Sequence, residues 1–70
     1  MDERLRQRYS EFRMILDGFY VVPPELDQEW RDIYPIAFGT DVEIALLWDT
    51  FYAKIKKAND LSSKADELFR

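Results

Sequence analysis

The chain contains no cysteine and no histidine. A disulfide-stapled domain, Ser-His and Cys-His catalytic sites and nearly all transition-metal sites are therefore excluded, because each needs one of these side chains. The two glycines, Gly18 and Gly39, are too few and too far apart to form a phosphate-cradling loop. We therefore expect a protein that is not an enzyme and that uses no cofactor and no small-molecule substrate.

Long apolar runs are also missing. The longest, Ile44–Trp48 and Phe19–Pro24, are far shorter than the roughly 20 residues that span a bilayer. The first residues, Met1 to Arg4, are charged and lack the apolar core of a signal peptide. We expect a cytoplasmic protein that does not enter a membrane.

The chain has 70 residues and a mass of 8.4 kDa, which is enough for a single small domain over residues 1–70. A compact protein of this mass exposes about 4,600 Å² of surface. The hydrophobic gain from so small a core only just balances the entropy lost on ordering the chain. Since disulfides and a structural zinc are excluded, a partner or a second copy of the chain is the remaining means of stabilisation, unless the helices pack unusually well.

The strongest pattern lies in the C-terminal part, where apolar and small residues recur at alternating intervals of four and three. It predicts a long amphipathic helix over Asp41–Phe69, with a stripe formed by Ile44, Trp48, Phe51, Ile55, Ala58, Ser62, Ala65 and Phe69. Thr40 and Glu43 have the spacing of a capping box. Weak helix formers at Asn59–Ser63 leave open a kink or a separate short helix. Because the stripe keeps its phase there, we expect continuity or a kink.

Two shorter helices are expected before it. The first, Asp2–Asp17, should end at Gly18, which can adopt a left-handed conformation. Its expected apolar face consists of Leu5, Tyr9, Phe12, Leu16 and Phe19, with Ile15 beside them. Residues Phe19–Pro24 should be extended, because proline disfavours a helical residue before it, and should cover the core as a strap.

The second helix is expected from Pro24 or Glu25 to Tyr34, with Pro35 ending it. Its apolar positions, Leu26, Trp30 and Ile33, have helical spacing. The sequence therefore predicts an all-α fold in which two short helices pack on a long C-terminal helix.

The lengths of these helices suggest that the long one is incompletely covered. At 1.5 Å per residue it measures about 43 Å, and the other two, about 24 and 15 Å, could cover one side if placed end to end. Yet Val42 and Leu46 lie on the face opposite Trp48, so the start of the helix is apolar nearly all round. Eleven aromatic residues are also many for so small a core. We expect four residues to be surplus to the monomer core and to form an interface: Trp30, Val42, Leu46 and Tyr52.

Carboxylates are the remaining candidates for chemistry. Glu25, Asp27, Glu29 and Asp32 could gather a hard cation, but they lack the glycine and the terminal glutamate of a calcium-binding loop. We expect them to form a solvated acidic face rather than a metal site.

The leading hypothesis is a non-enzymatic protein-interaction module that self-associates through its long C-terminal helix. The net charge of −4 is uneven, because residues 21–50 carry seven acids and one base, whereas residues 51–70 carry five bases and three acids. The acidic middle leaves open a nucleic-acid mimic or an inhibitor that binds a basic host protein. A second alternative is a small helical nucleic-acid-binding protein, which the pI of 4.6 and the scattered lysines disfavour.

Overall fold

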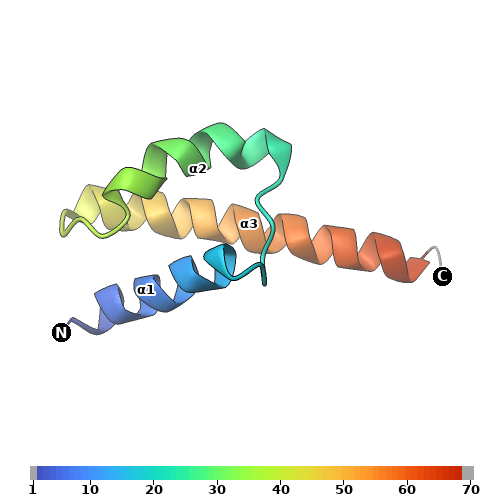
Figure 1. Ribbon diagram of the computed structural model, residues 1–70, viewed down its shortest axis with the longest axis horizontal. Helices are drawn as coiled ribbons and strands as arrows, with labels where there is room; N and C mark the ends of the chain where they lie inside the picture. Colours follow the sequence, from blue (N-terminus) through green and yellow to red (C-terminus); the bar gives the residue numbers. More distant parts are fainter. Residues whose placement is uncertain (1, 69–70) are drawn as a thin grey trace.

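Three α-helices are present in the computed structural model, which describes the backbone of residues 2–68 and the side chains of residues 2–61 (Figure 1). The elements in chain order are α1 (Glu3–Leu16), a 3-10 turn (Pro24–Leu26), α2 (Asp27–Ile33), a second 3-10 turn (Tyr34–Ile36) and α3 (Val42–Leu68). No strand occurs within residues 2–68. The predicted all-α arrangement of two short helices and a long third helix is confirmed.

Both ends of α1 are capped, and Gly18 follows the helix where the sequence predicts its end. The side chain of Asp2 accepts a hydrogen bond of 3.0 Å from the backbone N–H of Arg4, which satisfies one of the free donors of the first turn. Beyond the C-terminus of the helix, Gly18 has a φ of 87°, a conformation that favours glycine. The next amide, that of Phe19, donates back to the carbonyl of Met14 at 2.9 Å. The chain therefore leaves α1 sharply.

The face that α1 buries differs from the predicted one. Its buried residues are Arg8, Phe12 and Ile15, whereas Tyr9 and Leu16, expected in the core, are about half exposed. At 100° per residue, the buried face is rotated by roughly 50° from the expected apolar stripe. The guanidinium of an arginine therefore occupies a core-facing position of α1.

Residues 19–24 cover the core as the expected strap, but only residues 21–23 are extended, because Phe19 and Tyr20 form a bend after α1 and Pro24 begins the first 3-10 turn. Only half of the apolar side chains of the strap reach the core. Tyr20 and Val22 pack against the core, whereas Phe19 and Val21 are exposed. Successive side chains of an extended segment point in opposite directions, which accounts for the contrast between exposed Val21 and partly buried Val22.

A side chain of α3 fixes the strap in place. The Oδ1 atom of Asn59 accepts a hydrogen bond of 3.0 Å from the N–H of Val21, and its Nδ2 donates to the carbonyls of Val21 at 3.0 Å and Ile55 at 2.7 Å. One amide side chain thus satisfies both polar groups of a strap residue, much as a neighbouring strand would.

The second helical region is shorter and less regular than predicted. Its middle is α-helical, but both ends tighten into 3-10 turns, and Pro35 lies within the second turn instead of ending the helix. Leu26 and Ile33 are buried, as their spacing predicts. The following loop is tightly packed at Gly39, where a Cβ atom would overlap the Cδ1 atom of Ile44 and lie 3.3 Å from the carbonyl oxygen of Ile36.

The long helix α3 is a single element. It passes through residues 59–63 without interruption, which confirms continuity and excludes a separate short helix. The amide of Ala45 donates to the carbonyl of Asp41 at 3.2 Å, so Asp41 occupies the N-cap position that we predicted for Thr40. The predicted stripe positions Trp48, Phe51 and Ile55 are almost completely buried. The last predicted stripe positions, from Ser62 onward, lie outside the residues whose side chains are described.

The two short helices lie side by side along α3 rather than end to end. Figure 1 shows α1 and α2 on either side of the N-terminal half of α3, with the remainder of α3 extending beyond both. The longest dimension, 44 Å, is close to the roughly 41 Å length of α3 alone. The chain exposes 5577 Å² of surface, which exceeds the value for a compact protein of its mass by roughly 1,000 Å². The elongated shape accounts for this excess.

The core lies where α1, α2, the strap and α3 meet. It consists of Phe12, Ile15, Leu26, Ile33, Ala37, Trp48, Phe51, Tyr52 and Ile55. Phe12 is at its centre, because its ring lies within 6 Å of the rings of Trp30, Tyr34, Phe38 and Trp48. Aromatic contacts between elements therefore supply much of the packing.

Candidate interaction surfaces

The structure divides the four predicted interface residues into two pairs. Tyr52 is 8% exposed and belongs to the core, and Trp30 packs partly buried against Phe51 with ring centroids 5.8 Å apart. The expectation that these two are surplus to the monomer core is wrong. Helix α2 places Trp30 against Phe51 of α3, and the strap places Tyr20 over Tyr52. Val42 and Leu46, by contrast, are 74% and 61% exposed.

We define the outer face of α3 as the side directed away from the core. It comprises Val42, Glu43, Leu46, Leu47, Thr50, Ala53 and Lys57, all exposed. On a helix of 3.6 residues per turn these positions lie on the side opposite Trp48 and Ile55, with Leu47 at its edge. Three large aliphatic side chains therefore occupy the first two turns of a surface that no other described element covers.

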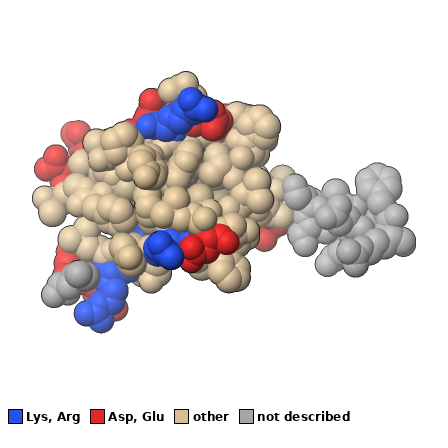
Figure 2. Space-filling model, viewed as in Figure 1, with Lys and Arg blue, Asp and Glu red and all other residues tan. Residues whose placement is uncertain are grey.

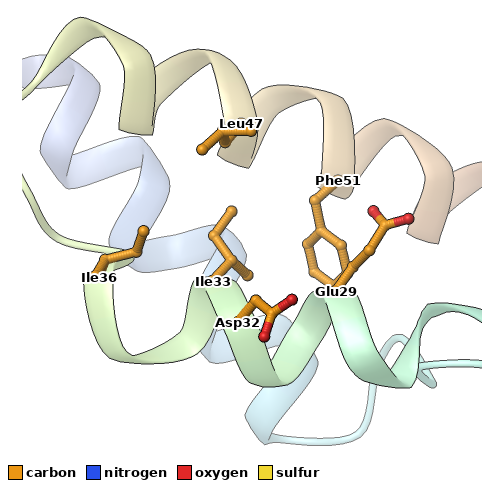
Figure 3. A pocket seen from close by; sticks show the side chains of 6 residues that line it. All are labelled: Glu29, Asp32, Ile33, Ile36, Leu47 and Phe51. Carbon is orange, nitrogen blue, oxygen red and sulfur yellow. The ribbon is translucent and has the colours of Figure 1, made fainter.

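A hollow with a volume of about 270 Å³ borders this face between α2 and α3. Figure 3 shows Ile33 and Ile36 directed toward Leu47 and Phe51 of α3 across this space. The carboxylate of Asp32 lies on the α2 side of the same hollow, whereas Glu29 reaches from α2 toward α3, where it pairs with Lys54. The interior of the hollow is therefore apolar and its rim acidic.

A second depression, of about 440 Å³, lies between α1 and α3 on the other side of Leu46. Its lining combines apolar groups with charged ones: Arg4, Gln7, Arg8, Glu11, Val42, Ala45, Leu46 and Asp49. Leu46 also borders a shallow hollow on the α2 side, together with Leu47 and Thr50. Leu46 therefore stands on a ridge between two depressions, the geometry that lets a second helix interdigitate with a first.

Sequence reasoning missed a second exposed surface, which we call the aromatic seam. It consists of Tyr9, Tyr34 and Phe38, which are 44–56% exposed and surround Phe12 where α1 meets the α2 region. On the face seen in Figure 2, charged side chains lie at the edges, and the area between α1 and α2 is largely uncharged. Apolar spacing alone does not reveal this surface, because it places Tyr9 on the core face of α1, whereas Tyr9 is 56% exposed.

Polar groups at the core are paired. The indole Nε1 of Trp48, itself fully buried, donates a hydrogen bond of 2.9 Å to the carboxylate of Glu11. Tyr20 and Tyr52 meet edge to face with ring centroids 5.8 Å apart. Burial raises the pKa of Tyr52 from 10.0 to about 12, and the negative charges of ionised Tyr20 and Glu11 and a hydrogen bond to Tyr20 add to the rise.

This raised pKa predicts a loss of stability in alkaline solution. Between pH 10 and 12 the unfolded chain has lost the Tyr52 proton while the folded chain retains it, so rising pH favours unfolding. The raised pKa of Tyr52 contributes at most about 2–3 kcal/mol to the free energy of unfolding, and this contribution is complete below pH 10. Denaturant midpoints measured across this window should fall less steeply for Tyr52→Phe than for the wild type. Equal slopes for the two proteins would contradict the assignment.

The acidic residues of α2 have structural partners. Asp27 pairs with Arg31 at 3.0 Å, Glu29 pairs with Lys54 of α3 at 3.1 Å, and Asp32 accepts a hydrogen bond of 3.1 Å from Gln28. Among the described side chains, no group of three or more potential ligands is placed to hold a metal ion. These carboxylates therefore brace α2 internally and tie it to α3.

Comparison with known proteins does not assign a function to these surfaces. No helix within the described part of the chain has the length and apolar character needed to cross a bilayer. The site and fold define a small all-α protein of three helices with a partly uncovered long helix. No family model, curated protein or solved structure matches the chain.

Proposed function

We propose that the protein is a non-enzymatic protein-interaction module that self-associates through the outer face of α3. The observation that carries this proposal is the exposure of three neighbouring aliphatic side chains, Val42, Leu46 and Leu47, which are 74%, 61% and 57% exposed. On a regular helix such a group has no role in the monomer core, and covering it with apolar surface is favourable by about 25 cal/mol per Å².

The small size of the core supports the same proposal. Burial of the outer face of α3 against a second copy adds stability that the core of a single chain of this length supplies only in small measure.

The aromatic seam is the weaker candidate for self-association. Tyr34 and Phe38 pack against Phe12 with ring centroids 5.5 and 5.0 Å apart, and Tyr9 packs against Phe38 at 5.9 Å, so the buried parts of these rings already cover the monomer core. Val42 and Leu46 are not among the residues of the core or of its partly buried margin. The outer face of α3 therefore has more to gain from a partner.

Nucleic-acid binding has less support than self-association. Arg13, Arg31 and Lys54 each pair with a carboxylate of the same chain at 3.0–3.1 Å, which leaves fewer cations available for phosphates. Binding to DNA that weakens steeply with salt would favour this alternative, and absence of binding at low salt would exclude it.

Replacement of Leu46 with glutamate tests the proposal. The charge should dissociate the oligomer without reducing helicity, because the side chain of Leu46 is 61% exposed in the monomer and a desolvated carboxylate opposes association. The measurements are sedimentation equilibrium over a wide concentration range and circular dichroism. Leu16→Glu is the matched control, since Leu16 is 49% exposed at the end of α1, away from α3's outer face.

The expected results are a self-associating wild type, a monomeric Leu46→Glu variant and a self-associating Leu16→Glu variant. A wild type that remains an 8.4 kDa monomer at every concentration would refute self-association. Dissociation by Leu16→Glu but not by Leu46→Glu would assign the interface to a different surface.

A further inference from the structure

The outer face of α3 carries opposite charges toward its two ends. Glu43 lies in the first turn, and Lys57 lies 14 residues further along, about four turns or 21 Å. Fourteen residues bring a side chain back to within about 40° of the same direction, so both charges lie on one face. Neither residue forms a salt bridge with any side chain that the structure describes.

Thr50 is midway between these two charges. If two copies of α3 pack antiparallel about a two-fold axis at Thr50, Glu43 of each copy faces Lys57 of the other, because a two-fold axis repeats every contact. The same operation places Leu47 opposite Ala53. Ala53 is exposed and small, so it leaves room for the larger side chain of the other copy.

We propose that the occupant of the outer face of α3 is a second copy of this chain, bound antiparallel about Thr50. This inference rests on the self-association proposed above and specifies its geometry. Two symmetry-related pairs of Glu43 and Lys57 fix the orientation, and Leu47 against Ala53 supplies the apolar contact. The same axis sets Leu46 opposite the aliphatic stem of Lys54, whose ammonium group is held by Glu29. A parallel pair is disfavoured, since it would place Glu43 against Glu43 and Lys57 against Lys57.

The position of the lysine supports a role at a contact. An acid in the first turn of a helix is favoured by the helix macrodipole, which accounts for Glu43 without a partner. Lys57 lies in the middle of α3, where the macrodipole gives a cation no advantage. An antiparallel second copy supplies a partner for both charges.

Disulfide trapping tests the orientation directly, because the chain has no cysteine of its own. Three samples are compared under mild oxidation: Glu43→Cys alone, Lys57→Cys alone, and an equimolar mixture of the two variants. Antiparallel pairing predicts a covalent dimer in the mixture and none in either single variant. Covalent dimers of each variant with itself would overturn the antiparallel arrangement and indicate a parallel one.

Charge reversal tests the pairing of Glu43 with Lys57. Glu43→Lys and Lys57→Glu should each weaken the dimer roughly tenfold, because two attractive pairs become repulsive. The double variant, in which the charges are exchanged, should restore the affinity of the wild type. Glu25→Lys makes the same charge change at an exposed position outside α3 and should leave the affinity unchanged.

The outcomes separate the two proposals. If neither charge reversal changes the affinity of the dimer, or if Glu25→Lys changes it equally, the antiparallel pairing is overturned and self-association is retained. A wild type that is monomeric at every concentration overturns both proposals.

Discussion

Replacement of Trp48 with alanine should unfold the protein. Trp48 is fully buried, its ring lies within 6 Å of the rings of Phe12, Phe51 and Tyr52, and its indole binds Glu11. Removing a buried tryptophan side chain costs about 3–5 kcal/mol. A domain of this length has a total stability of about 4–10 kcal/mol, so from about a third to all of it would be lost, and the folded state would no longer predominate at the lower end of this range.

Circular dichroism and urea denaturation measure this effect. Trp48→Phe keeps much of the ring volume but loses the hydrogen bond to Glu11, so an intermediate loss of about 1–2 kcal/mol is expected. Phe19→Ala is the control, since Phe19 is 73% exposed and its truncation should change the stability by less than about 0.5 kcal/mol. A folded Trp48→Ala variant with near wild-type stability would show that the fold does not depend on the packing of this residue.

The helices and the core face of α3 could be predicted because they depend on local signals. Asp2 and Gly18 mark the ends of α1 through hydrogen bonding and backbone conformation, which need no tertiary information. The four-three spacing of Trp48, Phe51 and Ile55 identifies their common face whatever packs against it. The 3-10 turns at both ends of α2 were not foreseen, because apolar spacing does not distinguish a 3-10 turn from an α-helical one.

The orientation of α1 could not be predicted from apolar spacing. Arg8 and Glu11 face inward because each finds a hydrogen-bonding partner far along the chain, at Ala37 and Trp48 respectively. Apolar spacing alone places Tyr9 on the core face of α1, where the structure has Arg8 instead. Ala37 and Trp48 are 29 and 37 residues from Arg8 and Glu11 along the chain, so only the folded arrangement makes these charged positions of α1 favourable.

The candidate interface was predicted in part for the same reason. Val42 and Leu46 could be placed opposite the core face of α3 from helical geometry alone. The burial of Tyr52 depends on the strap, which Asn59 secures by hydrogen bonds to Val21. In the sequence Asn59 is marked only as a weak helix former, because a side chain that pairs with distant backbone leaves no periodic signal.

Arg8→Met should be the second most damaging substitution. Arg8 is 6% exposed, and its Nη1 donates hydrogen bonds of 2.9 Å to the carbonyls of Ala37 and Gly39, in the loop that leads into α3. Methionine keeps much of the aliphatic length but has no donor, so it leaves both carbonyls without this partner. Since hydrogen bonds from charged donors contribute about 1.5–3 kcal/mol each and the second is only partly buried, a loss of about 2–4 kcal/mol is expected.

Urea denaturation of Arg8→Met, Arg8→Lys and Arg13→Met distinguishes this bracing role from a general effect of charge. Lysine retains the charge but lacks the planar fork of donors, so Arg8→Lys should recover only part of the stability. Arg13 lies on the same helix, but its ion pair with Asp17 is half exposed, so Arg13→Met should cost less than about 1 kcal/mol.

Hydrogen exchange at the Ala45 amide should accelerate in Arg8→Met, because the loop that positions the first turn of α3 is released. Equal losses for Arg8→Met and Arg13→Met would mean that the two carbonyls do not depend on the guanidinium, and that α1 and the start of α3 are held together by apolar packing alone.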